Sequence, residues 1–128
     1  MRVRHMNIPS EAEEQKTLFQ WVEIARKRHP ELGLLYHIPN GGSRNRIEAR
    51  NLKLQGVKAG VPDICLPVAR GGYSALYIEM KNCKGGRLSN YQREWLTALA
   101  NAGNLAVVCN GWEQAKETIL RYLEEATK

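Results

Sequence analysis

The fold of this chain is decided by the stretch Leu76-Tyr77-Ile78-Glu79-Met80-Lys81, in which apolar residues occupy every second position. Successive side chains of a β-strand point to opposite faces. Leu76, Ile78 and Met80 would therefore share one face, while Glu79 and Lys81 share the other. The stretch predicts a strand that buries its apolar face and presents a carboxylate and an ammonium group two residues apart on the opposite face.

A second apolar run, residues 63–68, precedes this strand and is joined to it through a turn that contains Gly71 and Gly72. A connection of this length predicts a hairpin that brings Asp63 back beside Glu79. Two carboxylates and an ammonium group suit a divalent metal ion and a water that must be deprotonated, as in phosphodiester hydrolysis. An ion pair on a solvated strand face is the alternative interpretation, since Glu-x-Lys is common and also occurs at Glu14 and Lys16.

The remaining sequence predicts four helices and two more strands around this hairpin. Capping boxes at Ser10 with Glu13 and at Ser89 with Gln92 begin two of the helices. The expected helices are residues 11–28, 46–55, 90–102 and 112–125, and the further strands are 34–38 and 105–109. This order predicts an α/β fold with a central mixed β-sheet flanked by helices. Residues 1–9 are expected to form a flexible N-terminal arm, and residues 10–128 a single domain.

The composition is that of an ordinary globular domain, with 128 residues, of which 43% are hydrophobic and 25% are charged. No apolar run approaches the length of a membrane span. The three cysteines, Cys65, Cys83 and Cys109, lack Cys-x-x-Cys spacing, so neither a zinc site nor a disulfide framework is expected. A reduced cytoplasmic setting, in a bacterial or phage-infected cell, is the expectation, with no membrane partner.

Positive charge brackets the acidic pair along the sequence, and the formal net charge is +6. One group of basic residues precedes Asp63 and another follows Glu79. The first contains Arg44, Arg46, Arg50, Lys53 and Lys58, and the second contains Lys81, Lys84, Arg87 and Arg93. Basic residues around a candidate catalytic centre favour nucleic acid as the partner.

These motifs resemble those of the VRR-NUC domain, the virus-type replication-repair nuclease branch of the PD-(D/E)XK superfamily. The resemblance is carried by residues 60–63 (Gly-Val-Pro-Asp), residues 79–81 (Glu-Met-Lys), a glutamate on the first helix, and Ser89 with Gln92. It extends over about residues 10–123, and residues 39–42 and 56–60 also resemble segments of the family. It implies a restriction-endonuclease-like core, as in stand-alone phage and bacterial members.

The resemblance also implies cleavage of DNA that depends on Mg²⁺ or Mn²⁺. Carried over to this sequence, the catalytic residues are Asp63, Glu79 and Lys81, and the metal ligands are Asp63, Glu79 and the carbonyl of Met80. The acid on the first helix is Glu14 or Glu11, with Glu14 favoured because Glu11 lies in the first helical turn. Gln92 is a further candidate for the catalytic site, although it would equally serve to cap its helix.

Six residues are candidates for binding DNA: Asn40, Arg44, Arg46, Lys58, Lys84 and Arg87. Asn40 is followed by two glycines, so its backbone N–H groups would be able to approach a phosphate, although a plain turn fits as well. Tyr73 and Tyr91 are expected to flank the site, where they would either stack on a base or simply pack.

The resemblance further implies a homodimer that acts on branched DNA, above all four-way (Holliday) junctions, in replication, recombination or repair. Two alternatives remain open. One is a nuclease that acts on flaps or on plain duplex, and the other is a DNA-binding module that keeps this fold without catalysis. The complete set of Asp63, Glu79 and Lys81 favours an enzyme.

Overall fold

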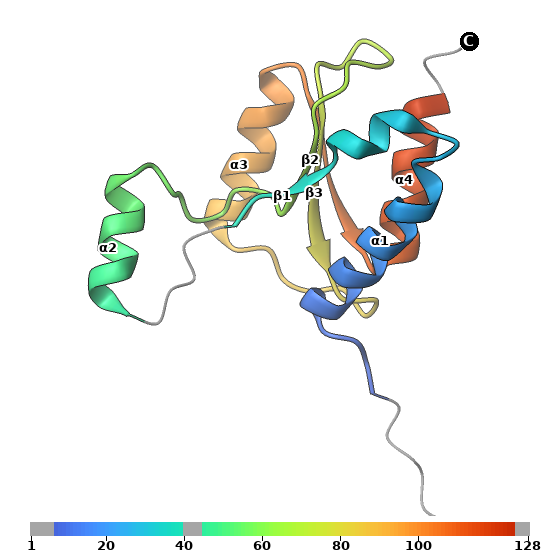
Figure 1. The fold of residues 1–128 in the computed structure, drawn as a ribbon. Coiled ribbons are helices and arrows are strands. Elements are labelled where there is room, and N and C mark those ends of the chain that lie inside the picture. The colour runs from blue at the N-terminus through green and yellow to red at the C-terminus, as the bar shows by residue number, and fades with distance from the viewer. Residues whose placement is uncertain (1–6, 40–44, 125–128) are drawn as a thin grey trace, which may run out of the picture.

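A computed structural model describes residues 7–39 and 45–124 of the chain, and it forms a four-stranded sheet with helices on both faces (Figure 1). The strand order is β1-β2-β3-β4. The short strand β1 (Tyr36–His37) pairs antiparallel with β2 (Ile64–Leu66), which pairs antiparallel with β3 (Leu76–Lys81). β3 pairs in parallel with β4 (Leu105–Asn110). The expected mixed α/β sheet is confirmed.

Helices α1 (Glu11–Ala25) and α4 (Trp112–Glu124) cover one face of the sheet, and α3 (Asn90–Asn101) lies on the other (Figure 1). The core lies between α1, α4 and the sheet, because the apolar side chains of β2 and β3 point to that face. It contains Leu18, Val22, Ile64, Leu66, Leu76, Ile78, Met80, Ala115 and Ile119. The alternation read from residues 76–81 therefore sorts the two faces as predicted.

The parallel pairing of β3 with β4 requires a crossover, and α3 supplies it. Ser89 caps α3, since its hydroxyl accepts a hydrogen bond from the Gln92 N–H, and the Gln92 side chain accepts one from the Ser89 N–H. Ser10 and Glu13 cap α1 in the same way. Both predicted capping boxes are therefore confirmed.

The strand expected at residues 34–38 is wrong in its first half. Residues Pro30–Leu34 form a short 3₁₀ helix, and only Tyr36 and His37 pair as strand. Pro30 has its φ fixed near the helical value and stands at the first position, where its missing N–H is not needed. Leu32 is buried in the core by this turn.

The second strand is also shorter than the expected 63–68, because β2 ends at Leu66 and Pro67, which cannot donate to a ladder, follows it. Helix α2 (Arg46–Leu54) forms as predicted and stands away from the sheet (Figure 1), with none of its residues buried. Gly56, which follows α2, has a positive φ of 101°, as a helix-ending glycine should.

The boundary expected between an arm and a domain falls close to the start of the described residues. Residues 7–10 precede α1 without helix or strand, and residues 1–6 lie outside the described part of the chain. Within residues 7–39 and 45–124, no helix combines the length and the apolar character that a membrane crossing requires.

Candidate active site

The acidic and basic residues singled out in the hairpin meet at one end of the sheet. Glu79 and Lys81 lie on the α3 face of β3, two residues apart, and Asp63 comes directly before β2. Asp63 Oδ2 accepts a hydrogen bond of 2.7 Å from the backbone N–H of Met80, which places its carboxylate between Glu79 and Lys81 along the strand. The hairpin therefore brings Asp63 beside Glu79 as the sequence predicts.

Asp63 is also fixed through its backbone. Its carbonyl accepts hydrogen bonds from the Ile38 N–H (2.7 Å), and it lies 2.8 Å from His37 Nδ1. These contacts tie the residue before β2 to the end of β1. The His37 ring thus contacts the backbone carbonyl of Asp63 and helps to hold that residue in place.

The Glu79 carboxylate is buried at 2% exposure and is only partly satisfied. Its Oε2 accepts a hydrogen bond of 3.1 Å from Gln92 Nε2, whereas Oε1 is buried and finds no hydrogen-bond partner among the described residues. Burial, the neighbouring charge of Asp63 and a hydrogen bond that protonated Glu79 shares with Asp63 raise the pKa of Glu79 to about 8, and the charge of Glu11 also raises it. The Lys81 ammonium acts in the opposite direction.

Lys81 is also buried, with 5% of its surface exposed, and its ammonium lies near the Glu79 carboxylate. Its Nζ donates to Gln92 Oε1 over 3.3 Å and lies 4.0 Å from Glu79 Oε2. The neighbouring Gly86 makes room for the lysine stem, because a Cβ at that position would lie 3.1 Å from Lys81 Cδ. The chain therefore packs tightly around the aliphatic part and leaves the ammonium at the carboxylates.

Gln92 caps its helix and also contacts both charged residues of the candidate site, while a catalytic role for it stays a prediction. Its Oε1 accepts from the Ser89 N–H and from Lys81, and its Nε2 donates to Glu79. The cap thus orients the amide, and the oriented amide links the carboxylate to the ammonium. The capping position of Gln92 at the start of α3 is therefore also what brings its amide to Glu79 and Lys81.

Gly60 sets the distance between the Asp63 loop and α3. Its φ is 89°, and a Cβ there would lie 2.5 Å from the backbone carbon of Tyr91. Any side chain at this position would push the loop away from the first turn of α3, where Gln92 begins its reach toward Glu79. The glycine of the Gly-Val-Pro-Asp motif is required by this close approach.

The two acids of the first helix have different surroundings. Glu14 is buried at 4% exposure, and its Oε1 accepts a hydrogen bond of 3.1 Å from the Trp112 N–H at the start of α4. Glu11 is exposed and is the acid of α1 whose charge acts on Glu79. Glu14 is thus hydrogen-bonded to α4, whereas the charge of Glu11 acts on Glu79. Which of the two glutamates takes part in catalysis stays a prediction.

Four of the six candidate DNA-binding residues are described, and all four are exposed: Arg46, Lys58, Lys84 and Arg87. Arg46 opens α2, Lys58 lies in the loop before Asp63, and the other two lie in the loop after β3. Asn40 and Arg44 lie outside the described residues. DNA contact by these side chains stays a prediction.

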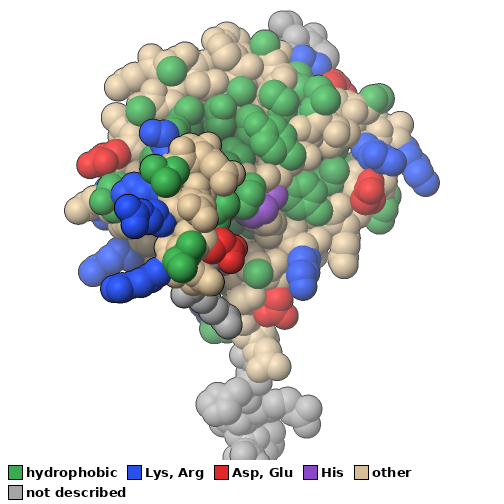
Figure 2. All heavy atoms as spheres, turned by 60° about the vertical axis from the view of Figure 1, so that its left-hand side comes forward, with side chains coloured by type: hydrophobic (Ala, Val, Ile, Leu, Met, Phe, Trp, Pro, Cys, Tyr) green, Lys and Arg blue, Asp and Glu red, His purple; other side chains and the backbone are tan. Residues whose placement is uncertain are grey.

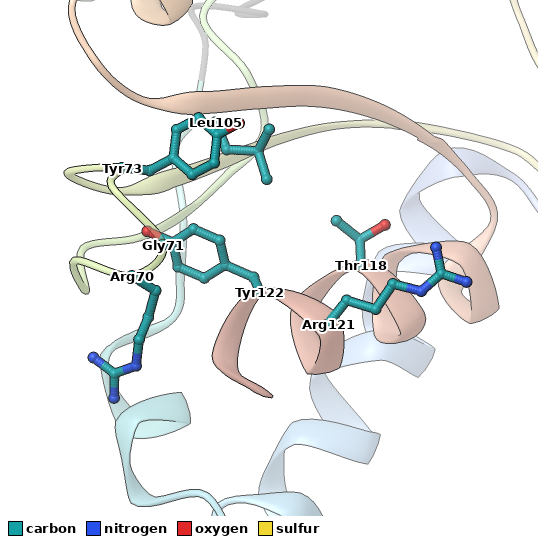
Figure 3. A pocket seen from close by; sticks show the side chains of 7 residues that line it. All are labelled: Arg70, Gly71, Tyr73, Leu105, Thr118, Arg121 and Tyr122. Atoms are coloured by element: carbon teal, nitrogen blue, oxygen red, sulfur yellow. The ribbon is translucent and has the colours of Figure 1, made fainter. Parts of the chain in front are cut away.

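A pocket of about 190 Å³ lies at the other end of the sheet (Figure 3). Its lining comes from the β2–β3 turn, the start of β4 and the outer part of α4: Arg70, Gly71, Tyr73, Leu105, Thr118, Arg121 and Tyr122. Leu105 is paired with Leu76, at the opposite end of β3 from Lys81. Tyr73 packs against Tyr122 there, so the expectation that Tyr73 flanks the acidic site is wrong.

The candidate metal ligands in the structure are few. Within the described residues, no group of three or more His, Cys, Asp or Glu side chains comes together to hold an ion. Asp63 and Glu79 are therefore the side-chain oxygens available at the centre, and a backbone carbonyl such as that of Met80 would have to complete the set. Carboxylate and carbonyl oxygens are the ligands that Mg²⁺ and Mn²⁺ prefer.

Comparison with known proteins agrees with this arrangement. The family model of the VRR-NUC domain matches residues 6–113. Among solved structures, the chain is similar to a VRR-NUC domain protein, with 30% sequence identity and a TM-score of 0.77 over 92% of this chain and 91% of that one. No curated protein was found to match the sequence. The match spans the Asp63 hairpin, Gln92 and α1, and the chain belongs to the VRR-NUC domain family, a family of nucleases of the PD-(D/E)XK superfamily.

Proposed function

We propose that this protein is a Mg²⁺- or Mn²⁺-dependent endonuclease that hydrolyses phosphodiester bonds in DNA. One observation carries the proposal: two neighbouring carboxylates, Asp63 and Glu79, share the end of the sheet with a buried lysine, and Glu79 Oε1 has no hydrogen-bond donor among the described residues. A buried oxygen of this kind costs free energy unless something binds it.

The residues present fit a divalent cation. Asp63 raises the pKa of Glu79 because two like charges are held together, and a cation between them would remove that repulsion. Asp63 and Glu79 would hold the ion, with the Met80 carbonyl as a further ligand. When bound, a divalent ion supplies Lewis-acid stabilisation of the phosphate and lowers the pKa of a water molecule.

The side chains of the site would do the remaining work. Lys81 would orient the attacking water and stabilise the negative charge that develops on the phosphate, since its ammonium is held at the carboxylates within a poorly hydrated site. Gln92 would keep Lys81 and Glu79 at fixed positions through its two hydrogen bonds. Each group is oriented before substrate arrives, which lowers the cost of reaching the transition state.

We infer that the preferred substrate is branched DNA, with four-way junctions first, and that the chain acts as a homodimer. Each chain has one candidate active site, whereas resolving a junction requires two nicks on opposing strands. Two-fold pairing of identical chains supplies two sites with matched geometry, and cyclic dimers are the commonest closed assembly.

The test is a panel of end-labelled substrates of equal length: single strand, duplex, flap, splayed arm and four-way junction. Each is incubated with Mg²⁺, Mn²⁺, Ca²⁺ or excess EDTA, and the mass of the protein is measured by light scattering in the same buffer. We expect cleavage with Mg²⁺ or Mn²⁺, fastest on the junction, from a dimer. Robust cleavage in EDTA would refute the metal requirement, and equal rates on duplex and junction by a monomer would refute the substrate and the assembly.

A further inference from the structure

A row of aromatic side chains runs across the sheet on the same face as the catalytic residues. The strand register aligns Tyr36 of β1 with Cys65 of β2, and Cys65 with Tyr77 of β3. Residues aligned in this way point to one face. Tyr77 and Glu79 alternate with buried core residues on β3, so the row lies on the α3 face, and its Tyr77 end is one repeat of the pleat (~7 Å) from Glu79.

Cys65 lies between the two tyrosines in the register of the three strands. A hydrogen bond with Cys65 is the main cause that raises the pKa of Tyr36. Burial, followed by the charge of Cys65 and a hydrogen bond with it, raises the pKa of Tyr77 to about 12. Cys65 itself is buried. Tyr36 and Tyr77 are therefore the neighbours of a buried Cys65 along the row, and neither phenol is charged at neutral pH.

The row stays open to solvent at its outer end. Helix α3 packs against β4, at the far edge of the sheet from β1. Tyr36 is consequently 48% exposed. We call Tyr36 and Tyr77, with Cys65 beneath them, the tyrosine platform.

Basic side chains lie on the same side of the molecule as α2 and α3 (Figure 2). Figure 2 looks toward the side of the molecule on which α2 and α3 lie, and it shows hydrophobic side chains across the middle with Lys and Arg side chains grouped at one edge. The exposed basic residues of α2 and of the following loop are Arg46, Arg50, Lys53 and Lys58. Positive charge combined with exposed aromatic rings is the pairing of features that binds single-stranded nucleic acid.

We propose that the tyrosine platform stacks an unpaired nucleobase next to the scissile phosphate. A base stacked inside a duplex cannot offer its face to a protein ring, whereas a base at a branch point or in a single-stranded segment can. The tyrosine platform would therefore hold a nucleotide close to the cut that is unpaired, or that opens from its pair at a branch point. This inference rests on the proposed nuclease function, because it takes the Glu79 end of the sheet as the place of cleavage.

The test measures DNA binding in excess EDTA, so that no cleavage is needed. Fluorescence anisotropy of labelled single-stranded and blunt duplex oligonucleotides is recorded at one salt concentration for wild type, Tyr36→Ala, Tyr36→Phe and Tyr73→Ala. Tyr73 is the matched control, since it is 40% exposed but lies at the other end of the sheet. We expect Tyr36→Ala to weaken single-strand binding about tenfold and to leave duplex binding nearly unchanged. Tyr36→Phe, which keeps the ring, and Tyr73→Ala should bind as wild type does.

Three results would overturn the proposal. Equal loss of single-strand and duplex binding in Tyr36→Ala would mean that the ring only supports the fold or the phosphate contacts. Loss in Tyr36→Phe would assign the effect to the hydroxyl. A smaller mass of Tyr36→Ala in light scattering would make the surface an interface between two copies of the chain. If wild type failed to cleave DNA while Tyr36→Ala still lost single-strand binding selectively, the nuclease proposal would fail and the binding surface would stand.

Discussion

Gln92 joins Glu79 to Lys81 through a single side-chain amide, which donates 3.1 Å to the carboxylate and accepts 3.3 Å from the ammonium. The same amide oxygen accepts a hydrogen bond from the Ser89 N–H, so the Gln92 side chain belongs both to the N-terminal cap of α3 and to the candidate site. A helix cap usually stabilises only its helix. Here it also sets the geometry of two charged residues on another element.

The first prediction separates the two roles of Gln92. Gln92→Ala should lower the free energy of unfolding by about 1 kcal/mol and also greatly slow cleavage, since it removes both the cap and the link. Ser89→Ala is the matched control, because it removes the hydroxyl that caps α3 but leaves the bonds of Gln92 to Glu79 and Lys81. It should be destabilised to a similar extent and keep most of its cleavage rate. Chemical denaturation and single-turnover cleavage provide the two readouts, and equal loss of rate in both variants would reduce Gln92 to a cap.

The second prediction concerns the three central residues. Asp63→Asn, Glu79→Gln and Lys81→Met should each slow cleavage about 100-fold or more, because charge stabilisation of the transition state is lost. DNA affinity in EDTA should stay within about tenfold of wild type, since exposed lysines and arginines supply most phosphate contacts. Quenched-flow cleavage and anisotropy would measure the two quantities. A wild-type rate in Asp63→Asn would show that the site is elsewhere.

The third prediction compares the two acids of α1. Glu14→Gln can still accept the hydrogen bond of the Trp112 N–H, whereas Glu14→Ala cannot, so the alanine variant alone should lose about 1–3 kcal/mol of stability. Because Glu11 is the acid of α1 that acts on Glu79, Glu11→Gln should impair metal-dependent cleavage more than Glu14→Gln does. Melting curves and cleavage rates decide the matter. Loss of cleavage in a stable Glu14→Gln variant, with Glu11→Gln active, would return the catalytic role to Glu14.

The fourth prediction follows from the raised pKa of Glu79. The folded protein holds the Glu79 proton up to about pH 8, whereas the unfolded chain releases it near the ordinary value of 4.5. Folding is therefore favoured by this group at low pH, and in EDTA stability should fall as the pH rises from about 5 to 8. Thermal melting of wild type and Glu79→Gln over this range is the measurement. Glutamine cannot ionise, so the melting temperature of the variant should fall less between pH 5 and 8 than that of wild type. The same pH dependence of the melting temperature in both proteins would contradict a raised pKa of Glu79.

The sequence predicted much of this centre because its signals are local. The alternation of residues 76–81 sorted core from site, and the capping box placed Gln92 at the first turn of a helix. Other relationships depend on residues far apart in the chain. Glu14 meets Trp112 across 98 positions, and no local pattern distinguishes such an acid from its neighbour Glu11.

Two errors have similar causes. Tyr73 is close to Glu79 in sequence, but the six residues of β3 carry the chain from one end of the sheet to the other. Residues 34 and 35 have an apolar pattern that fits a strand, yet Pro30 and the burial of Leu32 favour a 3₁₀ turn. The tyrosine row was not predicted at all, since it depends on the register of three strands. The sequence indicated only that Tyr77 lies on the opposite face of its strand from the core residues.

The central claim is that Asp63 and Glu79 together bind a divalent cation, and calorimetric titration with Mn²⁺ at pH 7 tests it most directly. Because Glu79 has a pKa of about 8, it is mostly protonated at this pH, and binding should release close to one proton per ion. Titrations in buffers of different ionisation enthalpy measure that release. The account predicts binding with proton release in wild type, and loss of both in Glu79→Gln and in Asp63→Asn. Unchanged Mn²⁺ affinity in Glu79→Gln would contradict it.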